Sequence, residues 1–228
     1  MMIAGMVKSS LVDYPELVAG VLFVPGCNYN CFYCHNRSLL DGTHDIIEQQ
    51  EVTDFLKKRV GLLDGIVITG GEPTLQKDLI STLREIKELG YKIKLDTNGS
   101  SPVTIAQLLQ YGLCDFYAID YKAPAARYQE ICGRGANAET VLKTIGLLLD
   151  NQADFEVRTT VIPQLLEADL MCMAKELPVV PRYVLNRYRT PEKYLSVDRD
   201  RIAAKPYTQA QIDALKVLIS TRQPNVLM

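Results

Sequence analysis

Residues 18–36 read V-A-G-V-L-F-V-P-G-C-N-Y-N-C-F-Y-C-H-N, an apolar stretch followed at once by three cysteines. Cys27, Cys31 and Cys34 have the spacing C-x3-C-x2-C, so short loops return each sulfur to the same point. In a reducing compartment such a trio indicates metal binding rather than disulfides. Three thiolates are one too few to saturate a four-iron cluster. The fourth iron keeps an open position, which a catalytic metal site needs in order to bind a further ligand.

A zinc site made of Cys27, Cys31, Cys34 and His35 is the alternative interpretation of this stretch. Zinc accepts these ligand types in a tetrahedral arrangement. The adjacent residues Cys34 and His35 are awkward ligands for one tetrahedral ion, and zinc knuckles favour paired two-residue gaps. The spacing therefore favours an iron–sulfur cluster.

Length and composition predict one domain. The chain has 228 residues, of which 47% are apolar, and a net charge of −2. No basic run indicates nucleic-acid binding, and no apolar stretch reaches the roughly 18 residues of a membrane span. We expect a cytoplasmic protein with a single domain over residues 1–228, a core at about 16–190 and a C-terminal helix at 208–220. The remaining cysteines, Cys114, Cys132 and Cys172, are expected to be buried as small hydrophobic residues.

Short apolar stretches alternate with helical patterns along the chain. Strands are expected at residues 18–24, 65–69, 92–96, 116–119, 156–161 and 182–185. Helices are expected at residues 53–63, 77–89, 103–110, 139–149, 168–177 and 208–220. The alternation predicts an α/β fold with parallel strands and right-handed crossovers. It fits an incomplete (β/α)6 barrel and an open wound sheet equally well.

Polar motifs begin where the expected strands end. They are Gly70-Gly71-Glu72-Pro73, Asp96-Thr97-Asn98-Gly99 and Asp120-Tyr121-Lys122, and Arg158 lies within the fifth strand. Ligands bind at this edge of parallel α/β folds. The glycines let backbone approach a ligand, the second motif could hold ribose hydroxyls or a hard cation, and the cations could bind a carboxylate. Turn chemistry alone could explain any single motif.

The cysteine motif after a strand, together with the G-G-E-P run, resembles the radical S-adenosylmethionine (SAM) enzymes. The resemblance implies an incomplete barrel in which three cysteines hold a 4Fe–4S cluster and SAM binds the fourth iron. It assigns the cluster and the radical chemistry to Cys27, Cys31 and Cys34. SAM contacts are implied for Tyr33, Gly70, Gly71, Glu72, Asp96, Asn98, Lys122 and Arg158.

The runs L-D-T-N-G, I-D-Y-K and V-R-T-T-V-I-P, in this order, resemble the activating enzymes of glycyl radical proteins. The runs S-L-V-D-Y-P and C-H-N are similar to the branch that activates anaerobic ribonucleoside-triphosphate reductases. The resemblance implies such a reductase, or another glycyl radical enzyme, as the partner. It also implies a low-potential electron donor such as a flavodoxin or ferredoxin.

The same resemblance implies a monovalent cation surrounded by Asp96, Thr97, Asp120 and the SAM carboxylate. The histidine that some relatives place on the sixth strand end is missing from Leu185-Asn186-Arg187-Tyr188. Residues 34–70 hold no cysteine beyond Cys34, so we expect only one cluster. Residues 189–207 could flank the barrel mouth and touch a partner, but the preferred interpretation is a solvated connector before the last helix.

Two alternatives to a glycyl radical activating enzyme stay open. One is a radical SAM enzyme that acts on a small molecule, such as a modified-base precursor, because a compact chain of this length would serve that function equally well. The other is a non-catalytic zinc-binding interaction module. Iron content separates the zinc module from both enzymes, and a radical on a partner protein separates the two enzymes.

Overall fold

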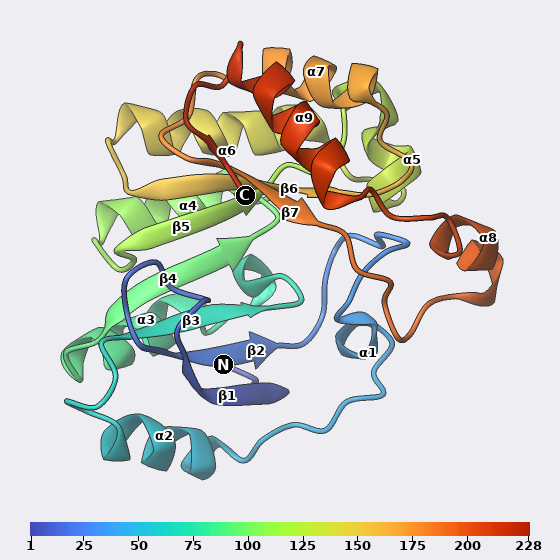
Figure 1. Ribbon diagram of the computed structural model, residues 1–228. Helices are drawn as coiled ribbons and strands as arrows, with labels where there is room; N and C mark the ends of the chain where they lie inside the picture. Colours follow the sequence, from blue (N-terminus) through green and yellow to red (C-terminus); the bar gives the residue numbers. More distant parts are fainter. The chain divides into compact units, whose positions relative to one another are not determined.

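The computed structural model describes all residues from 1 to 228. Its eight-stranded sheet has the strand order β1-β2-β3-β4-β5-β6-β7-β8, the order in which the strands follow one another along the chain (Figure 1). The strands are β1 (Gly5–Ser10), β2 (Ala19–Val24), β3 (Gly65–Gly70), β4 (Lys92–Thr97), β5 (Phe116–Asp120), β6 (Phe155–Val161), β7 (Tyr183–Arg187) and β8 (Val226–Leu227).

The helices lie between these strands, as the alternating pattern predicts. They are α1 (Arg37–Leu40), α2 (Gln49–Lys58), α3 (Leu79–Glu88), α4 (Pro102–Gln110), α5 (Tyr128–Cys132), α6 (Ala138–Asp150), α7 (Glu167–Glu176), α8 (Arg199–Ile202) and α9 (Gln209–Ser220), with short 3-10 turns at Pro73–Leu75, Ala125–Arg127 and Ser196–Asp198. The predicted α/β class with mostly parallel strands is confirmed.

The chain forms two compact units, each of which is described by itself. Unit 1 comprises Met1–Asn28, Ser38–Thr97 and Val103–Ala118. In it β2, β3 and β4 pair in parallel, and β1 adds an antiparallel edge to β2. The apolar stripe of α3 buries Leu79, Leu83 and Ile86, as its i, i+4, i+7 spacing predicts. Unit 1 therefore holds the strands that lead into the first two polar motifs.

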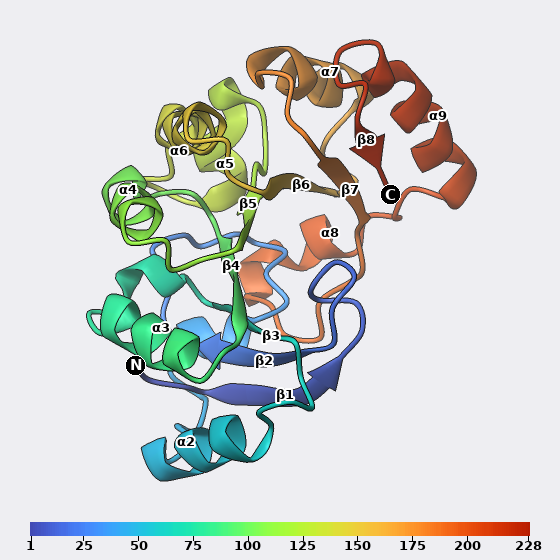
Figure 2. The same ribbon diagram turned by 90° about the vertical axis from the view of Figure 1, so that its left-hand side faces the viewer.

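Unit 2 comprises Tyr29–Arg37, Asn98–Pro102 and Ile119–Met228. Its strands β6, β7 and β8 pair in parallel, and α7 and α9 lie side by side (Figures 1 and 2). The N-terminus of α9 is closed by a capping box, in which Thr208 and Gln211 satisfy each other's backbone N–H groups. Unit 2 carries two of the three motif cysteines, Asp120 and Lys122 of the third polar motif, and Arg158.

Two predictions about the elements are wrong in detail. The helix expected at residues 53–63 lies at Gln49–Lys58, because Gly61 takes a left-handed φ of 76° and turns the chain out of the helix. The strand β1 was not expected, and it runs antiparallel to β2. None of the helices is both long and apolar enough to cross a membrane.

Candidate functional site

The cysteine loop of unit 2 is held by a buried arginine. Cys31 is buried and Cys34 is partly buried, and neither forms a disulfide. The guanidinium of Arg37 donates to the backbone oxygen of Cys31 at 3.3 Å and to the side-chain oxygen of Asn30. The amide of Asn30 donates in turn to the backbone oxygen of Cys132 at 2.8 Å. The loop therefore has fixed backbone anchors on both sides of Cys31.

Cys132 contacts the Cys31 thiol directly. A hydrogen bond from the Cys132 side chain lowers the pKa of Cys31, against the effect of burial, and the positive charge of Lys122 lowers it further. Burial, and next the charge of Cys31, raise the pKa of Cys34. Because thiolates are the form that binds metals, Cys31 is the thiol of this loop that is better prepared for metal binding. The prediction of buried cysteines is confirmed for Cys132 and wrong for Cys172, which is exposed, and the contact of Cys132 with Cys31 was not foreseen.

Tyr33 lies between the two cysteines of this loop and is buried. Its ring packs edge-on against Phe32, with centroids 5.2 Å apart. Its hydroxyl group is buried without a hydrogen-bond partner. Burial raises the pKa of Tyr33 well above its usual range, although the charge of Lys122 opposes this. A neutral hydroxyl that lacks a partner is suited to meet a polar ligand.

The third polar motif forms a charged cluster at the end of β5. Asp120 accepts hydrogen bonds from Lys122 Nζ at 2.9 Å and from Arg158 Nε at 3.0 Å, one on each carboxylate oxygen. Burial acts to raise the pKa of Asp120, but the charges of Lys122 and Arg158 overcome it and lower the pKa to about 2. Asp120 is therefore ionised at neutral pH, and it orients two cations.

Asn98 and Gly99 form a tight turn in unit 2. The side-chain oxygen of Asn98 accepts from the amide of Ser100 at 2.9 Å, which is the Asx turn expected as the structural alternative. Gly99 has φ 72°, and its carbonyl oxygen accepts from the Thr144 hydroxyl at 2.7 Å. Asn98 is buried, so the turn fixes its amide in one orientation.

The glycines of the Gly70-Gly71-Glu72-Pro73 motif let two loops of unit 1 touch through backbone alone. A Cβ on Gly71 would lie 2.0 Å from the carbonyl oxygen of Gly26, the residue before Cys27. Gly70 has φ 111°, and a Cβ there would lie 2.6 Å from the amide nitrogen of Val24. The amide of Glu72 then donates to Gly26 at 2.7 Å. The loop that leads to Cys27 is therefore seated on this motif.

Glu72 is fully buried and organises the unit 1 motifs. One of its carboxylate oxygens accepts from the hydroxyls of Thr74 and Thr97, both at 2.6 Å, and from the amide of Thr74 at 3.0 Å. Thr97 ends β4, so this hydrogen bond joins the second polar motif to the first within unit 1. A buried carboxylate that accepts several hydrogen bonds has a fixed geometry.

Asp96 is paired with a lysine that lies outside the predicted motifs. Lys94 Nζ lies 2.7 Å from Asp96 Oδ1, and the two side chains are only 3% and 12% exposed. Both residues project from the same face of β4, because they are two positions apart in a strand. The lysine was read as part of an ordinary strand pattern, so sequence reasoning missed it.

Residues 189–207 pack against the cysteine loop within unit 2. The Arg201 guanidinium lies 3.7 Å from the centroid of the Phe32 ring, and it donates to the backbone oxygen of Glu130 at 3.2 Å. His35 forms a hydrogen bond with the backbone of Arg189, and burial lowers the pKa of His35. The interpretation of this segment as a solvated connector is therefore wrong for these two contact points.

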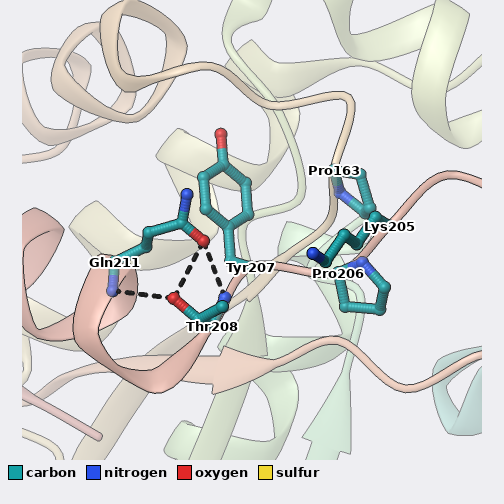
Figure 3. Close-up of a pocket in the computed structure, with 6 residues that line it drawn as sticks. All are labelled: Pro163, Lys205, Pro206, Tyr207, Thr208 and Gln211. Carbon is teal, nitrogen blue, oxygen red and sulfur yellow. Dashed lines mark hydrogen bonds between the residues drawn. The ribbon is translucent and has the colours of Figure 1, made fainter.

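A pocket elsewhere in unit 2 holds none of the predicted residues. It is lined by Pro163, Lys205, Pro206, Tyr207, Thr208 and Gln211, around the capping box of α9 (Figure 3). No group of three or more His, Cys, Asp and Glu side chains is arranged to hold a single metal ion. The ligand roles of Cys27, Cys31 and Cys34, and those of Asp96, Thr97 and Asp120, therefore stay predictions.

Comparison with known sequences agrees with these motifs. The sequence pattern of the radical SAM superfamily matches residues 21–177. A protein of Methanocaldococcus jannaschii, provisionally named as a glycyl-radical enzyme activating enzyme, is 35% identical over 202 residues, which are 85% of this chain and 82% of that protein. A protein of Pyrococcus abyssi, provisionally named as a GTP 3′,8-cyclase, is 36% identical over 86 residues, which are 37% of this chain and 28% of that protein.

Solved structures share the fold at low sequence identity. SuiB of Streptococcus suis, crystallised with S-adenosylmethionine, superposes with a TM-score of 0.67 and 15% identity, over 88% of this chain and 48% of SuiB. A domain of a pyruvate-formate lyase-activating enzyme from Bacteroides vulgatus gives a TM-score of 0.54 and 18% identity, over 69% of this chain and 94% of that domain. The chain thus spans about half of SuiB, and the predicted incomplete-barrel class is confirmed.

Proposed function

The chain belongs to the radical SAM superfamily, and from this premise we propose that it is an activating enzyme that removes a hydrogen atom from a glycine of a partner protein. The observation that carries the proposal is the 35% identity, over 85% of the chain, to a protein provisionally named as a glycyl-radical enzyme activating enzyme. The family implies SAM and a 4Fe–4S cluster as cofactors.

The residues present fit these cofactors. None of Cys27, Cys31 and Cys34 forms a disulfide, and three thiolate donors match a cluster that keeps one iron open. A Cβ on Gly71 would collide with the carbonyl oxygen of Gly26, so the motif whose backbone the family resemblance assigns to SAM is held against the loop that leads to Cys27. The buried Tyr33 hydroxyl has no hydrogen-bond partner in the protein, and a bound ligand could supply one. We propose that the three cysteines hold the cluster.

Further residues of the chain would bind and orient SAM. When bound, the cluster supplies an electron that cleaves SAM, and SAM supplies the 5′-deoxyadenosyl radical that removes the hydrogen atom. Lys122 carries three N–H donors, of which Asp120 accepts one, so it can also bind a carboxylate. Arg158, Gly70, Glu72, Asp96 and Asn98 complete the proposed SAM contacts. Their fixed orientations favour one bound geometry.

We propose an anaerobic ribonucleotide reductase as the partner, with a flavodoxin or ferredoxin as the electron donor. The runs S-L-V-D-Y-P and C-H-N support this branch of activating enzymes. The substrate would be a glycine Cα–H on a loop of the reductase. The proposed location is the cytoplasm, where thiols stay reduced.

A second candidate function is radical chemistry on a small molecule. The similarity to a provisionally named GTP 3′,8-cyclase favours it, although that similarity covers only 37% of this chain. Both enzymes would cleave SAM in the same way, so SAM cleavage alone does not distinguish them. The identity of the hydrogen donor does.

The test uses anaerobically reconstituted full-length protein. We expect a brown protein with about four irons per chain that cleaves SAM when reduced. Incubation with the glycyl radical enzymes of the host should give the electron-spin signal of a glycyl radical on one of them. SAM cleavage without any such signal would support the small-molecule function, and a colourless protein with one zinc would leave only the zinc module.

A further inference from the structure

One face of β4 carries an ion pair where an apolar pair would be expected. Ile93 and Leu95 are fully buried on one face of this strand, while Lys94 and Asp96 occupy the other. The Lys94 side chain is only 3% exposed, and its ammonium lies 2.7 Å from the Asp96 carboxylate. Strands of parallel sheets are commonly apolar on both faces, so this pair is a departure that calls for a reason.

Stability does not supply that reason. Burying a lysine and an aspartate removes both charges from water, and their attraction rarely repays this cost in full. Well-packed apolar residues at the same positions are often neutral or more stable. The pair is therefore better explained by what its charges do than by its contribution to folding.

The cation ligands implied by the family are already engaged by side chains of the protein. In unit 1 the Asp96 carboxylate is paired with Lys94, and the Thr97 hydroxyl donates to Glu72. In unit 2 both oxygens of Asp120 accept from cationic side chains. A sodium or potassium ion is held by negative charge that is not otherwise balanced, and here side chains of the protein balance it. These residues do not fit an exchangeable monovalent cation.

We propose that the ammonium group of Lys94 is a built-in cation that takes the place of an exchangeable monovalent metal ion beside Asp96 during SAM binding. The proposal rests on the SAM binding proposed above. An ammonium group carries the same single charge as potassium and has a similar size. Because it is tied to β4, it cannot dissociate, and its site needs no ion from solution. Lys94 is in this sense a positioning residue that acts through Asp96.

The first measurement needs no substitution. SAM affinity of the reconstituted wild-type protein is measured by calorimetry in sodium, potassium and choline chloride at equal ionic strength. Choline is too large to occupy a site for a small monovalent ion. We expect the three dissociation constants to agree within about twofold. An affinity that falls by about tenfold or more in choline would show that the protein needs a small ion, and would overturn the proposal.

The second measurement removes the ammonium. Lys94→Ala should weaken SAM binding in choline by about tenfold or more, because Asp96 loses the cationic partner that lies 2.7 Å from it. Sodium or potassium should restore part of this loss, since the shortened side chain leaves space for an ion. Unchanged affinity in choline, or a loss that neither ion restores, would contradict the proposal. The second outcome would assign Lys94 a packing role only.

Lys87→Ala is the matched control. Lys87 is a lysine of the same unit whose ammonium lies 2.7 Å from Asp115, in a pair about one-third exposed. Its removal should leave SAM affinity independent of the ion. If Lys94→Ala does not fold, Lys94→Met keeps the aliphatic stem without the charge, and it should weaken SAM binding in all three salts because it leaves no space for an ion. Wild-type affinity from Lys94→Met in choline would overturn the proposal.

A readout without SAM separates this inference from the proposed function. Sodium-23 magnetic resonance should show no potassium-sensitive line broadening with wild-type protein or Lys87→Ala, and should show it with Lys94→Ala. If the wild-type protein binds no SAM, the proposed function fails, while this readout still reports on the built-in cation. Potassium-sensitive broadening with the wild-type protein would overturn the inference even where SAM binds.

Discussion

Two lysine–aspartate pairs of this protein have the same spacing but different surroundings. Lys94 and Asp96 on β4 are 3% and 12% exposed, and Asp96 is the single ion-pair partner of Lys94. Lys122 and Asp120 at the end of β5 are 17% and 29% exposed, and Arg158 adds a second cation to the same carboxylate. The Lys94 ammonium is closed off from solvent, so it can act only through its charge. The second pair, Lys122 and Asp120, is here called the open pair. It is exposed enough for the N–H groups of Lys122 to bind a ligand.

The largest expected effect comes from removing the thiol of Cys31, the residue of the cysteine loop that interacts with Lys122. The positive charge of Lys122 stabilises the thiolate form of Cys31, so Lys122 of the open pair interacts with this proposed cluster ligand. Cys31→Ala should abolish SAM cleavage and lower the iron content of reconstituted protein, because two thiolates cannot hold the cluster. Iron analysis and product chromatography measure both. Cys172→Ala, at an exposed cysteine on α7, is the control and should keep both SAM cleavage and the iron content.

The next effect tests whether the open pair binds a ligand. Lys122→Met should weaken SAM binding by about ten- to a hundredfold, because it removes a charge-assisted hydrogen bond to a carboxylate. Calorimetry in potassium chloride measures the affinity, and Lys175→Met, at an exposed lysine of α7, serves as control. Wild-type affinity in Lys122→Met would reduce the open pair to a structural role and remove the contrast with Lys94.

A smaller effect concerns the stability of the open pair. The Asp120 pKa is lowered to about 2 from 3.8, so the ionised form stabilises the fold above about pH 4 and this contribution is lost as the pH falls towards 2. Asp120→Asn should lower the free energy of unfolding by roughly 2 kcal/mol at neutral pH. Urea titrations of cluster-free protein should show the difference shrinking below pH 4. A difference that does not change with pH would contradict the assignment.

The smallest effect concerns the contact of residues 189–207 with the cysteine loop. Arg201→Met removes the cation–π contact with Phe32 and should lower the free energy of unfolding by about 1 kcal/mol. The reconstituted variant should also lose its cluster faster on dilution. Arg84→Met is the matched control, because Arg84 stacks on Tyr111 in unit 1 at 4.8 Å. It should lower stability by a similar or smaller amount and leave cluster retention unchanged. Equal cluster loss in both variants would refute a special role of Arg201.

The strand positions could be predicted from the sequence, because apolar runs between polar motifs indicate buried strands directly. All six expected strands begin within one residue of the observed position. The helix expected at 53–63 was misplaced because its first turn, Gln49-Gln50-Glu51, is polar and carries no periodic signal. The edge strand β1 was missed because half of it is polar.

The site was predicted in its motifs but not in its contacts. The run K-I-K-L-D alternates, which shows that Lys94 and Asp96 share a face, but alternation does not reveal that this face is buried. The contact of Cys132 with Cys31 joins positions about a hundred residues apart, and no local spacing encodes it. Arg201 and Arg37 were missed for the same reason, since their partners are defined only by the folded chain.

The backbone contact between Gly26 and Gly71 has a consequence for laboratory evolution of this protein. With the carbonyl oxygen 2.0 Å from where a methyl group would stand, a saturation library at position 71 should return glycine alone among folded clones. Attempts to alter substrate choice by diversifying this loop would therefore be wasted at that codon. Variation is better directed to neighbours such as Leu75, which is half exposed.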